Sequence, residues 1–247
     1  MQIFPLSEGA FTVDKTKQFV PFNLKQDDLQ SRPRGSLLVE IQPFVIVTKK
    51  DIIVLDTGLG FTDKNGFLQI HRNLTQQGIA PDTVTKVLLS HLHKDHSGGI
   101  SHEGLLTFPK AIYFINKHEF EYAYEQQGSS YITSDLQALK GSPQLQLLED
   151  KGVIDDYIYY EMCNAHSLYH QVFRIIEDGE TIFFGGDVAP QLQQMKSKIV
   201  AKYDHDGRKS MELRKLWWQQ GLAENWAFLF YHDIKNPIYI ADALFKK

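Results

Sequence analysis

Short apolar runs alternate with polar turns along most of the chain, and this pattern predicts a protein that mixes strands with helices. Pro43 lies inside an apolar run and predicts a sheet edge or a break there, because proline cannot donate a hydrogen bond to a neighbouring strand. Runs with the length and composition of strands occur at residues 37–48, 52–55, 84–90, 111–115, 158–164, 170–178, 181–184 and 226–231.

Three segments have the periodicity of helices. In residues 67–78, Phe67, Ile70 and Leu74 recur at helical intervals, and Gly78 is placed to end the helix. Residues 117–126 predict a second helix. Residues 208–220 predict a third, amphipathic one, and at least one ring of Trp217 and Trp218 is expected in the core. Its mostly apolar stripe consists of Met211, Leu213, Leu216, Trp217 and Gln220. The polar residues 126–142 predict a loop with a short helix that could cover a site.

Two pairs of segments resemble each other within the chain. Residues 45–60 and 173–190 both read as strand, polar turn and apolar strand, followed by an aspartate and a loop. Residues 86–91 and 228–232 are both apolar runs that end on histidine. Such an echo predicts two similar halves that face each other across a cleft. We therefore expect an α/β fold, a four-layer αββα sandwich with two facing mixed β-sheets and helices outside, as a single domain over residues 1–247.

Composition adds little to the predicted fold, but it indicates which classes of protein and partner are compatible with the chain. Hydrophobic residues make up 43% and charged residues 23% of the 247 positions, as in ordinary globular proteins. The net charge of −4 gives no general attraction to nucleic acid, although a local basic patch is compatible with it. The single cysteine, Cys163, allows no internal disulfide. With neither a secretory leader nor a membrane-spanning stretch, the sequence predicts a cytoplasmic protein with a small-molecule substrate. Its aromatic content is compatible with a homodimer.

The run HLHKDH at residues 91–96 holds the strongest chemical signal in the chain. Four of its six side chains are of types that bind metal ions, and the run follows a strand directly. Three further candidates, His166, Asp187 and His232, also stand at or near the ends of apolar runs, where α/β sheets present functional groups. Five histidines and two aspartates could hold two divalent ions and leave coordination positions open for water.

This set resembles the metallo-β-lactamase superfamily, whose hallmark is His-X-His-X-Asp-His. VLDTGLG at residues 54–60, NAHSLYHQ at 164–171, FFGGDVAP at 183–190 and FYHD at 230–233 are similar to further family segments in the expected order. The resemblance implies a binuclear hydrolase in which a hydroxide between two ions attacks the substrate. Zinc is the expected metal, while the donor set leaves iron and manganese open.

The resemblance also assigns roles to single residues. It implies that His91, His93 and His166 bind one metal ion and that Asp95, His96 and His232 bind the other. Asp187 would bridge the two ions. We therefore expect Asp187 and Asp95 to be catalytic, with Asp95 able to help move a proton.

Several neighbouring residues are expected outside the ligand set. Asp56 is expected to hydrogen-bond a ligand histidine or simply to stabilise a turn. His170 is expected to support the site without binding metal, and Cys163 to pack. Four other histidines match no motif and are taken as ordinary surface or core residues: His71, His102, His118 and His205.

The sequence is most similar to the group that contains N-acyl homoserine lactonases and phosphotriesterase-like hydrolases. It departs from those lactonases at Pro190, where they typically have a tyrosine three residues after the bridging aspartate. We therefore expect hydrolysis of a carboxylic ester, lactone or thioester. Hydrolysis of a phosphodiester or phosphotriester is the main alternative. A metal-binding sensor without activity and an iron redox protein are further alternatives.

Overall fold

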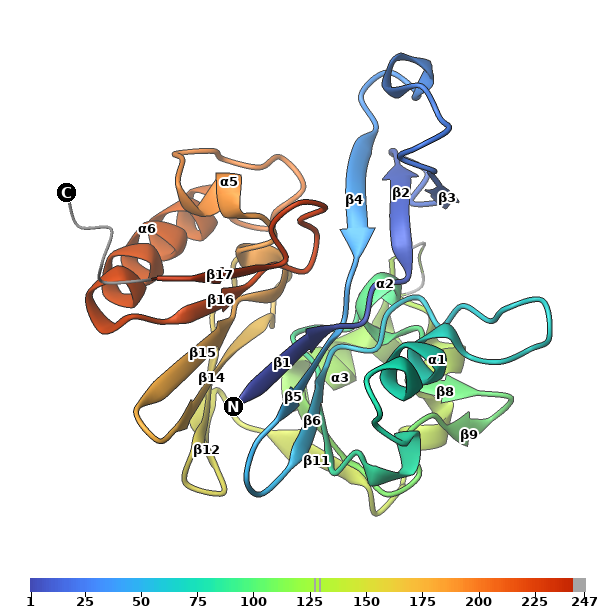
Figure 1. The fold of residues 1–247 in the computed structure, drawn as a ribbon, viewed down its shortest axis with the longest axis vertical. Coiled ribbons are helices and arrows are strands. Elements are labelled where there is room, and N and C mark those ends of the chain that lie inside the picture. The colour runs from blue at the N-terminus through green and yellow to red at the C-terminus, as the bar shows by residue number, and fades with distance from the viewer. Residues whose placement is uncertain (127, 129, 242–247) are drawn as a thin grey trace.

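Two six-stranded mixed sheets form the centre of the computed structural model, which describes residues 1–126, 128 and 130–241 (Figure 1). The first sheet has the order β1 (Gln2–Pro5), β5 (Phe44–Val47), β6 (Ile52–Leu55), β7 (Lys86–Leu88), β10 (Ile112–Asn116) and β11 (Leu145–Leu148). The second has the order β12 (Lys151–Ile154), β13 (Ile158–Met162), β14 (Gln171–Glu177), β15 (Glu180–Phe184), β16 (Ala227–Leu229) and β17 (Ile238–Ile240).

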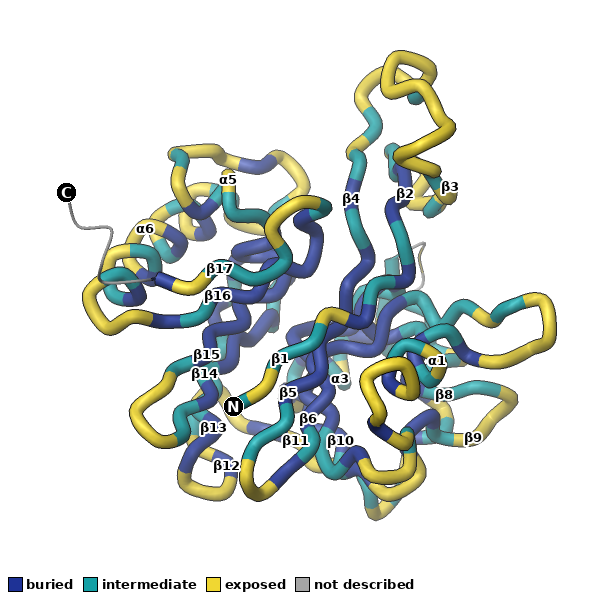
Figure 2. The backbone as a smooth tube through the Cα atoms, in the orientation of Figure 1, coloured by how far each residue is buried: buried dark blue, intermediate teal, exposed yellow. Residues whose placement is uncertain are grey.

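Apolar side chains cover both faces of each sheet, which fixes the layer order. Phe44, Leu55 and Phe184 belong to a core that fills the space between the sheets. The buried strands are dark in Figure 2, whereas the connecting turns are mostly exposed. A separate cluster covers the outer face of each sheet, so the four-layer sandwich expected from the sequence is confirmed.

Helices supply the two outer layers. The first sheet is covered by α1 (Gln69–Gln76), α3 (Lys117–Glu125) and α4 (Thr133–Leu136), whose buried residues share one cluster with the sheet. The second sheet is covered by α6 (Gly207–Glu224), with the short α5 (Leu192–Met195) beside it. The remaining short elements are α2 (Lys94–Ser97), a hairpin of β8 (Ser101–His102) and β9 (Leu105–Leu106), and four 3₁₀ turns at Leu29–Ser31, Pro81–Thr83, Gln137–Leu139 and Gly186–Val188.

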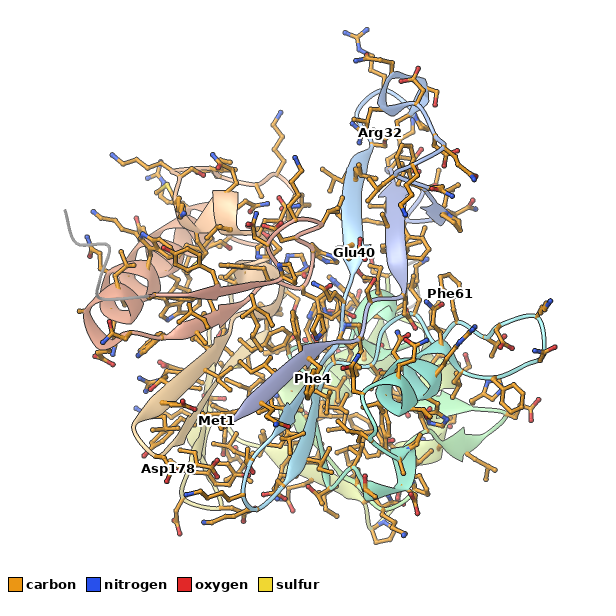
Figure 3. All side chains as sticks on the ribbon, in the orientation of Figure 1. Met1, Phe4, Arg32, Glu40, Phe61 and Asp178 are labelled. Carbon is orange, nitrogen blue, oxygen red and sulfur yellow. The ribbon has the colours of Figure 1, made fainter. Side chains whose placement is uncertain are left out.

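A three-stranded arm projects from this sandwich. It consists of β3 (Phe19–Pro21), β2 (Gly9–Val13) and β4 (Leu37–Ile41), paired antiparallel in that order. Figure 3 marks its length, with Arg32 near the tip and Glu40 near the base. Figure 2 shows that the tip is exposed whereas the base is buried. The sequence pattern does not reveal this arm, because β2 and β3 are short and β4, the other strand that pairs with β2, is distant in sequence.

The internal echo of the sequence corresponds to a repeated arrangement of strands. β5 and β6 form one antiparallel hairpin, and β14 and β15 form the other. In each half the second hairpin strand then pairs in parallel with a strand that leads to a histidine, β7 or β16. Asp56 and Asp187 follow the two hairpins. The two halves therefore direct equivalent strand ends to the same region.

Most of the predicted elements are confirmed, with two local corrections. The break predicted at Pro43 separates β4 from β5, and Gly78 follows α1 with a φ of +75°. Phe67, however, lies outside α1 and is 68% exposed, and Leu216 on α6 is 56% exposed. Trp217 is buried as expected. Among the described residues, no helix is both long and apolar enough to cross a membrane.

Candidate metal centre

All seven sequence-predicted ligand residues meet between the ends of the two sheets. The residues of HLHKDH follow β7, and α2 carries Asp95 and His96. His166 precedes β14, Asp187 lies in the turn after β15, and His232 follows β16. Each is buried or nearly so. Segments that lie far apart in the sequence are thus brought together by the pairing of β6 with β7 and of β15 with β16.

Asp187 is at the centre of the cluster. Its Oδ1 lies 2.9 Å from Nε2 of His232 and 3.1 Å from Nε2 of His96, and its Oδ2 lies 3.2 Å from Nε2 of His166. Asp95 approaches from one side, with Oδ2 3.6 Å from Nε2 of both His96 and His232. One carboxylate therefore faces histidines from both predicted metal-binding sets.

The donor atoms fall into three overlapping groups in which all atoms lie within 4.8 Å of one another. The groups are His91, His93 and His166; Asp95, His96 and His232; and His91, His96 and Asp187. The first two match the sets expected from the sequence. The third joins one histidine of each set through Asp187, so the geometry is that of two adjacent three-residue groups with a carboxylate between them.

Four of the five histidines are held from outside the cluster through Nδ1. Nδ1 of His96 lies 2.7 Å from Oδ2 of Asp56, and Nδ1 of His166 lies 2.9 Å from Oδ1 of Asp204. Nδ1 of His232 lies 2.7 Å from the carbonyl oxygen of Glu40 at the base of the arm. The hydroxyl of Ser90 lies 3.1 Å from Nδ1 of His91. These partners fix the orientation of each ring and direct Nε2 toward the cluster, as is usual for metal-binding histidines.

A buried glutamate on α3 holds the two histidine-bearing loops together. Oε1 of Glu119 accepts hydrogen bonds from the Leu92 amide at 2.9 Å and from the Tyr131 hydroxyl at 3.2 Å. Its Oε2 accepts one from the Ser167 hydroxyl at 3.5 Å. Leu92 stands between His91 and His93, and Ser167 follows His166. Glu119 therefore ties the HLHKDH loop to the His166 loop.

Burial and mutual charge shift the pKa values of the cluster in opposite directions. Burial places the pKa of His91 and of His93 well below the usual value, and the neighbouring histidines add to this shift. Burial also acts to lower the pKa of His96, but Asp187, Asp95 and Asp56 outweigh it and raise that pKa. The pKa of Asp187 is held well below its usual value by His232, His96 and His166, against the effect of burial. The carboxylate is thus ionised and attracts positive charge.

The residues present fit a pair of divalent cations. Nε2 of His91, Nε2 of His96 and Oδ1 of Asp187 are buried without a suitable hydrogen-bond partner among the described residues. Nδ1 of His93 faces Nε2 of His166 at 3.3 Å, so two ring nitrogens point at the same space. Lone pairs that converge without donors are costly to bury, and a shared cation would satisfy them. The donor set of nitrogen and carboxylate oxygen suits zinc, iron and manganese.

The cluster opens into a pocket of about 570 Å³. Strands of the arm form one wall, α2 another, and residues 190–203 a third. Pro190 lines the pocket at the position discussed above, and its carbonyl accepts a hydrogen bond from the His232 amide. Tyr203 also lines it, with its ring centroid 6.0 Å from that of His166. The pocket thus has a tyrosine ring beside the cluster, although nothing in the sequence points to this residue.

The other residues considered from the sequence lie around the cluster or away from it. Asp56 is fully buried, accepts hydrogen bonds from the Ser90 amide and hydroxyl, and contacts His96. Nε2 of His170 accepts from the Asp187 amide at 3.2 Å, and its Nδ1 lies 3.3 Å from Sγ of the buried Cys163. The remaining histidines stand outside all three donor groups: His71, His102, His118 and His205.

Sequence reasoning missed Asp204, Glu119 and Tyr203 among the residues that shape this site. Each lies in a segment without a recognisable motif, and each reaches the cluster through contacts between distant segments. A side chain that can accept hydrogen bonds next to a loop is too common to stand out in one sequence. The density of HLHKDH was, by contrast, visible without the fold.

Comparisons with known proteins agree with this geometry. Residues 40–216 match the family model described as the metallo-beta-lactamase superfamily. The N-acyl homoserine lactonase AttM of Agrobacterium fabrum (strain C58) is 35% identical over 135 residues, covering 50% of this chain and 48% of that protein. The lactamase-like protein notP of an Aspergillus species is 36% identical over 76 residues, covering 31% of this chain and 22% of that protein. The chain thus spans about half or less of the curated relatives it matches.

Solved structures share the fold over nearly the whole chain. A probable metal-dependent hydrolase from Staphylococcus aureus has a TM-score of 0.80 at 21% identity, covering 97% of this chain and 91% of its own. AidC, a dizinc quorum-quenching lactonase in complex with a product, has a TM-score of 0.74 at 18% identity, covering 96% of this chain and 89% of its own. The family model covers well over half of the chain, and the fold and the order of its motifs agree with it. The chain belongs to the metallo-β-lactamase superfamily.

Proposed function

We propose that this protein is a metal-dependent hydrolase that cleaves a carboxylic ester, lactone or thioester. The observation that carries the proposal is the pair of adjacent three-residue donor groups joined by the Asp187 carboxylate at the floor of a pocket. The similarity to lactonases of the same superfamily supports a carbonyl substrate. We further propose that residues 1–247 act as one domain and that zinc is the metal.

Each of two donor groups would bind one metal ion. One ion would be held by His91, His93 and His166. The other would be held by Asp95, His96 and His232, and Asp187 would bind both ions. When bound, such a pair of ions supplies hydroxide at neutral pH and stabilises negative charge on the substrate oxygen. The partners of Nδ1 keep each ring in place, so the donor atoms are arranged before substrate arrives.

Two further residues have roles in the proposed reaction. Asp95 faces both His96 and His232 and lines the pocket, so it is positioned to carry a proton to the leaving alcohol or thiol. Burial raises the pKa of Tyr203 to about 12, so its hydroxyl keeps its proton at neutral pH. We propose that Tyr203 donates a hydrogen bond to the substrate, because Pro190 has no donor to offer there.

A substrate panel tests the proposal. Protein loaded with zinc, manganese or iron is assayed with a γ-lactone, a 4-nitrophenyl ester, a thioester and bis(4-nitrophenyl) phosphate. Turnover of a carbonyl substrate that is lost after chelation and in Asp187→Ala supports the proposal. Turnover of the phosphodiester alone would replace it with phosphoester hydrolysis, for which the same pair of ions is equally suited. A metal-loaded protein that turns over none of these substrates would indicate a metal-binding protein without activity. Oxygen consumption by the iron-loaded protein would indicate a redox role.

Tyr203 is tested separately from the metal ligands. In Tyr203→Phe we expect kcat for the preferred carbonyl substrate to fall by about 100- to 1,000-fold, the range for loss of one donor to a developing oxyanion. Metal content should remain unchanged, because Tyr203 is outside the donor groups. An unchanged kcat would remove Tyr203 from the mechanism.

A further inference from the structure

Four lysines line the pocket above the metal centre. They are Lys15, Lys17, Lys94 and Lys202, whereas Asp14 is the one carboxylate of the described lining outside the seven donor residues. The whole chain has a net charge of −4, so this concentration of positive charge does not follow from the composition. Pockets focus the field of the charges that line them and raise the local concentration of ligands of opposite sign.

None of these four lysines forms an ion pair with a residue that the structure describes. The lysines that pair with carboxylates within 4.0 Å in the described part of the chain are Lys49, Lys86 and Lys110, all outside the pocket. Asp14 is occupied locally, since its Oδ1 accepts hydrogen bonds from the amide of Thr16 at 2.9 Å and from its hydroxyl at 2.6 Å. The ammonium groups are therefore available to a ligand.

Two of these lysines have defined surroundings, since Lys17 stands in a strained turn and Lys94 lies against an aromatic ring. Lys17 has a φ of +60°, in the left-handed region that disfavours side chains other than glycine, asparagine and aspartate. Its amide closes the turn onto the Asp14 carbonyl at 3.0 Å. Nζ of Lys94 lies 5.7 Å from the ring centroid of Phe19, between α2 and the arm. Lysine thus stands at a backbone position where glycine would be less strained.

Lys17 is also electrostatically close to the metal centre. Lys17 and the donor residue His93 line the same pocket. The charge of Lys17 therefore acts on the same space that the donor groups face.

The arm gives the pocket an apolar wall next to these charges. Phe19 comes from β3, and the other apolar residues of the wall come from β2 and β4: Val13, Leu37, Leu38 and Val39. A volume of about 570 Å³ is enough for a metabolite-sized molecule. The pocket therefore combines a candidate metal centre at its floor, an apolar side, and lysines that have no carboxylate partner among the described residues.

We propose that the pocket selects acyl substrates that carry a second, anionic group, a carboxylate or phosphate, away from the bond that is cleaved. This inference rests on the proposed hydrolysis of a carbonyl substrate. In that reaction an oxygen from water bonds to the acyl carbon, the bond to the alcohol oxygen or thiol sulfur breaks, and the leaving group takes the proton. The distal anion is unchanged and serves to bind the lysines, while the chain between the two groups lies along the apolar wall.

A matched pair of chromogenic esters tests the preference. Mono-4-nitrophenyl glutarate and 4-nitrophenyl pentanoate have acyl chains of the same length and differ by one distal carboxylate. We expect the zinc-loaded protein to have a kcat/KM at least about tenfold higher for the glutarate ester, decreasing as salt screens the exposed charges. 4-Nitrophenyl 4-phosphonobutanoate then distinguishes a phosphate-type anion from a carboxylate. A ratio of one, or preference for the neutral ester, overturns the inference while leaving hydrolysis intact.

Lysine variants locate the preference in the pocket. In Lys17→Met and in Lys202→Met, the ratio of the two kcat/KM values should fall about fivefold each, the factor for one exposed charge pair at about 4 Å. Lys64→Met is the matched control, because Lys64 is exposed and lies outside the pocket. An equal change in the control, or no change in either pocket variant, contradicts the assignment to these lysines.

A binding measurement separates this inference from the proposed reaction. Glutarate and pentanoate both have one carboxylate for the metal centre, and glutarate has a second one for the lysines. Calorimetry on the zinc-loaded protein should show tighter binding of glutarate, and Lys17→Met should reduce that difference. Should no carbonyl substrate be hydrolysed, the proposed function fails, and this comparison still decides whether the pocket selects anions. Equal affinities would show that it does not.

Discussion

Four of the five histidines of the candidate metal centre depend on partners that are not themselves donors to it. The partners are of three kinds: a carboxylate for His96 and His166, a backbone carbonyl for His232 and a hydroxyl for His91. An imidazole that donates through Nδ1 must present an unprotonated Nε2 when it is neutral, so these contacts determine which lone pair is available. Such partners therefore affect metal affinity without touching the metal.

Asp204 gives the sharpest test of this idea at the level of one residue. Its side chain is buried and its Oδ1 contacts Nδ1 of His166. In Asp204→Ala we expect zinc affinity to fall by about 10- to 100-fold, because His166 loses the group that orients it. Competition with a chromophoric chelator measures this change. Asp82→Ala is the control, since Asp82 is exposed and pairs with Lys110 at the surface. Equal affinities in the two variants would show that Asp204 does not support the site.

The seven donor candidates could be predicted from the sequence, but their supports could not. HLHKDH follows a strand and packs four suitable side chains into six positions, which is rare by chance. Asp204 and Glu119 show no such local density, and their contacts with His166 and Leu92 join segments that the sequence separates. Tyr203 is similar, because its place beside His166 depends on the path of the loop before α6. Local pattern identifies donors, whereas tertiary contacts identify what positions them.

Glu8 leads to a prediction about pH. Its carboxylate accepts a hydrogen bond from the Leu59 amide at 2.6 Å, and burial raises its pKa from 4.5 to about 7. Between these values the unfolded chain has lost the proton that the folded protein keeps, so stability should fall as pH rises from about 4.5 to 7. The full effect is about 3 kcal/mol. Urea unfolding of chelated protein across this range measures it. In Glu8→Gln, the free energy of unfolding should fall less with rising pH than in the original protein. The same pH dependence in both proteins would contradict the assignment to Glu8.

At the level of elements, the sequence predicted the sandwich better than the arm. Strands with long apolar runs, such as β6 and β15, are buried on both faces and stand out in the pattern. The face of α6 was harder to predict, because its buried positions are Ser210, Arg214, Trp217 and Gly221. The guanidinium of Arg214 donates to the carbonyls of Val188 and Ile199. Polar groups are thus buried on that face for hydrogen bonding, which apolar periodicity cannot reveal.

The loop after β6 packs directly on the backbone after α2, and glycine makes this contact possible. Gly60 has a φ of +73°, and a Cβ there would collide with the carbonyl of Gly98. Gly66 has a similar φ of +81° but open space around it. We expect Gly66→Ala to cost about 1 kcal/mol for the backbone alone, and Gly60→Ala to cost at least about 2 kcal/mol more.

Chemical denaturation of both glycine variants separates the two effects. The loop and α2 are adjacent to the HLHKDH histidines, so Gly60→Ala should also reduce the amount of zinc bound, whereas Gly66→Ala should leave it unchanged. Equal destabilisation of the two variants would mean that backbone conformation alone, and not the close approach to Gly98, explains the requirement for glycine.

On the scale of the whole molecule, the metal centre lies where two similar halves meet. The first half contributes the residues after β7, and the second contributes those before β14 and after β15 and β16. The arm joins this junction as well, because the Glu40 carbonyl holds His232. The buried carboxylates of Asp56, Asp95 and Asp187 lie close together there. Without cations, protonated histidines must balance these charges, and a buried cluster of this kind adds little stability by itself.

Metal binding should therefore stabilise the entire fold and not only one loop. A ligand that binds the folded state alone stabilises it by about 4 kcal/mol at a thousand times its dissociation constant. For a domain of this size, that corresponds to a rise in Tm of about 8 to 16 °C. Differential scanning calorimetry of chelated and zinc-loaded protein measures the rise, and it should appear as a shift of one cooperative transition because both halves supply ligands. In Asp187→Ala, most of the zinc-dependent rise in Tm should be lost. A zinc-independent Tm would contradict the idea that the cation links the halves, and two separate transitions would show that they unfold independently.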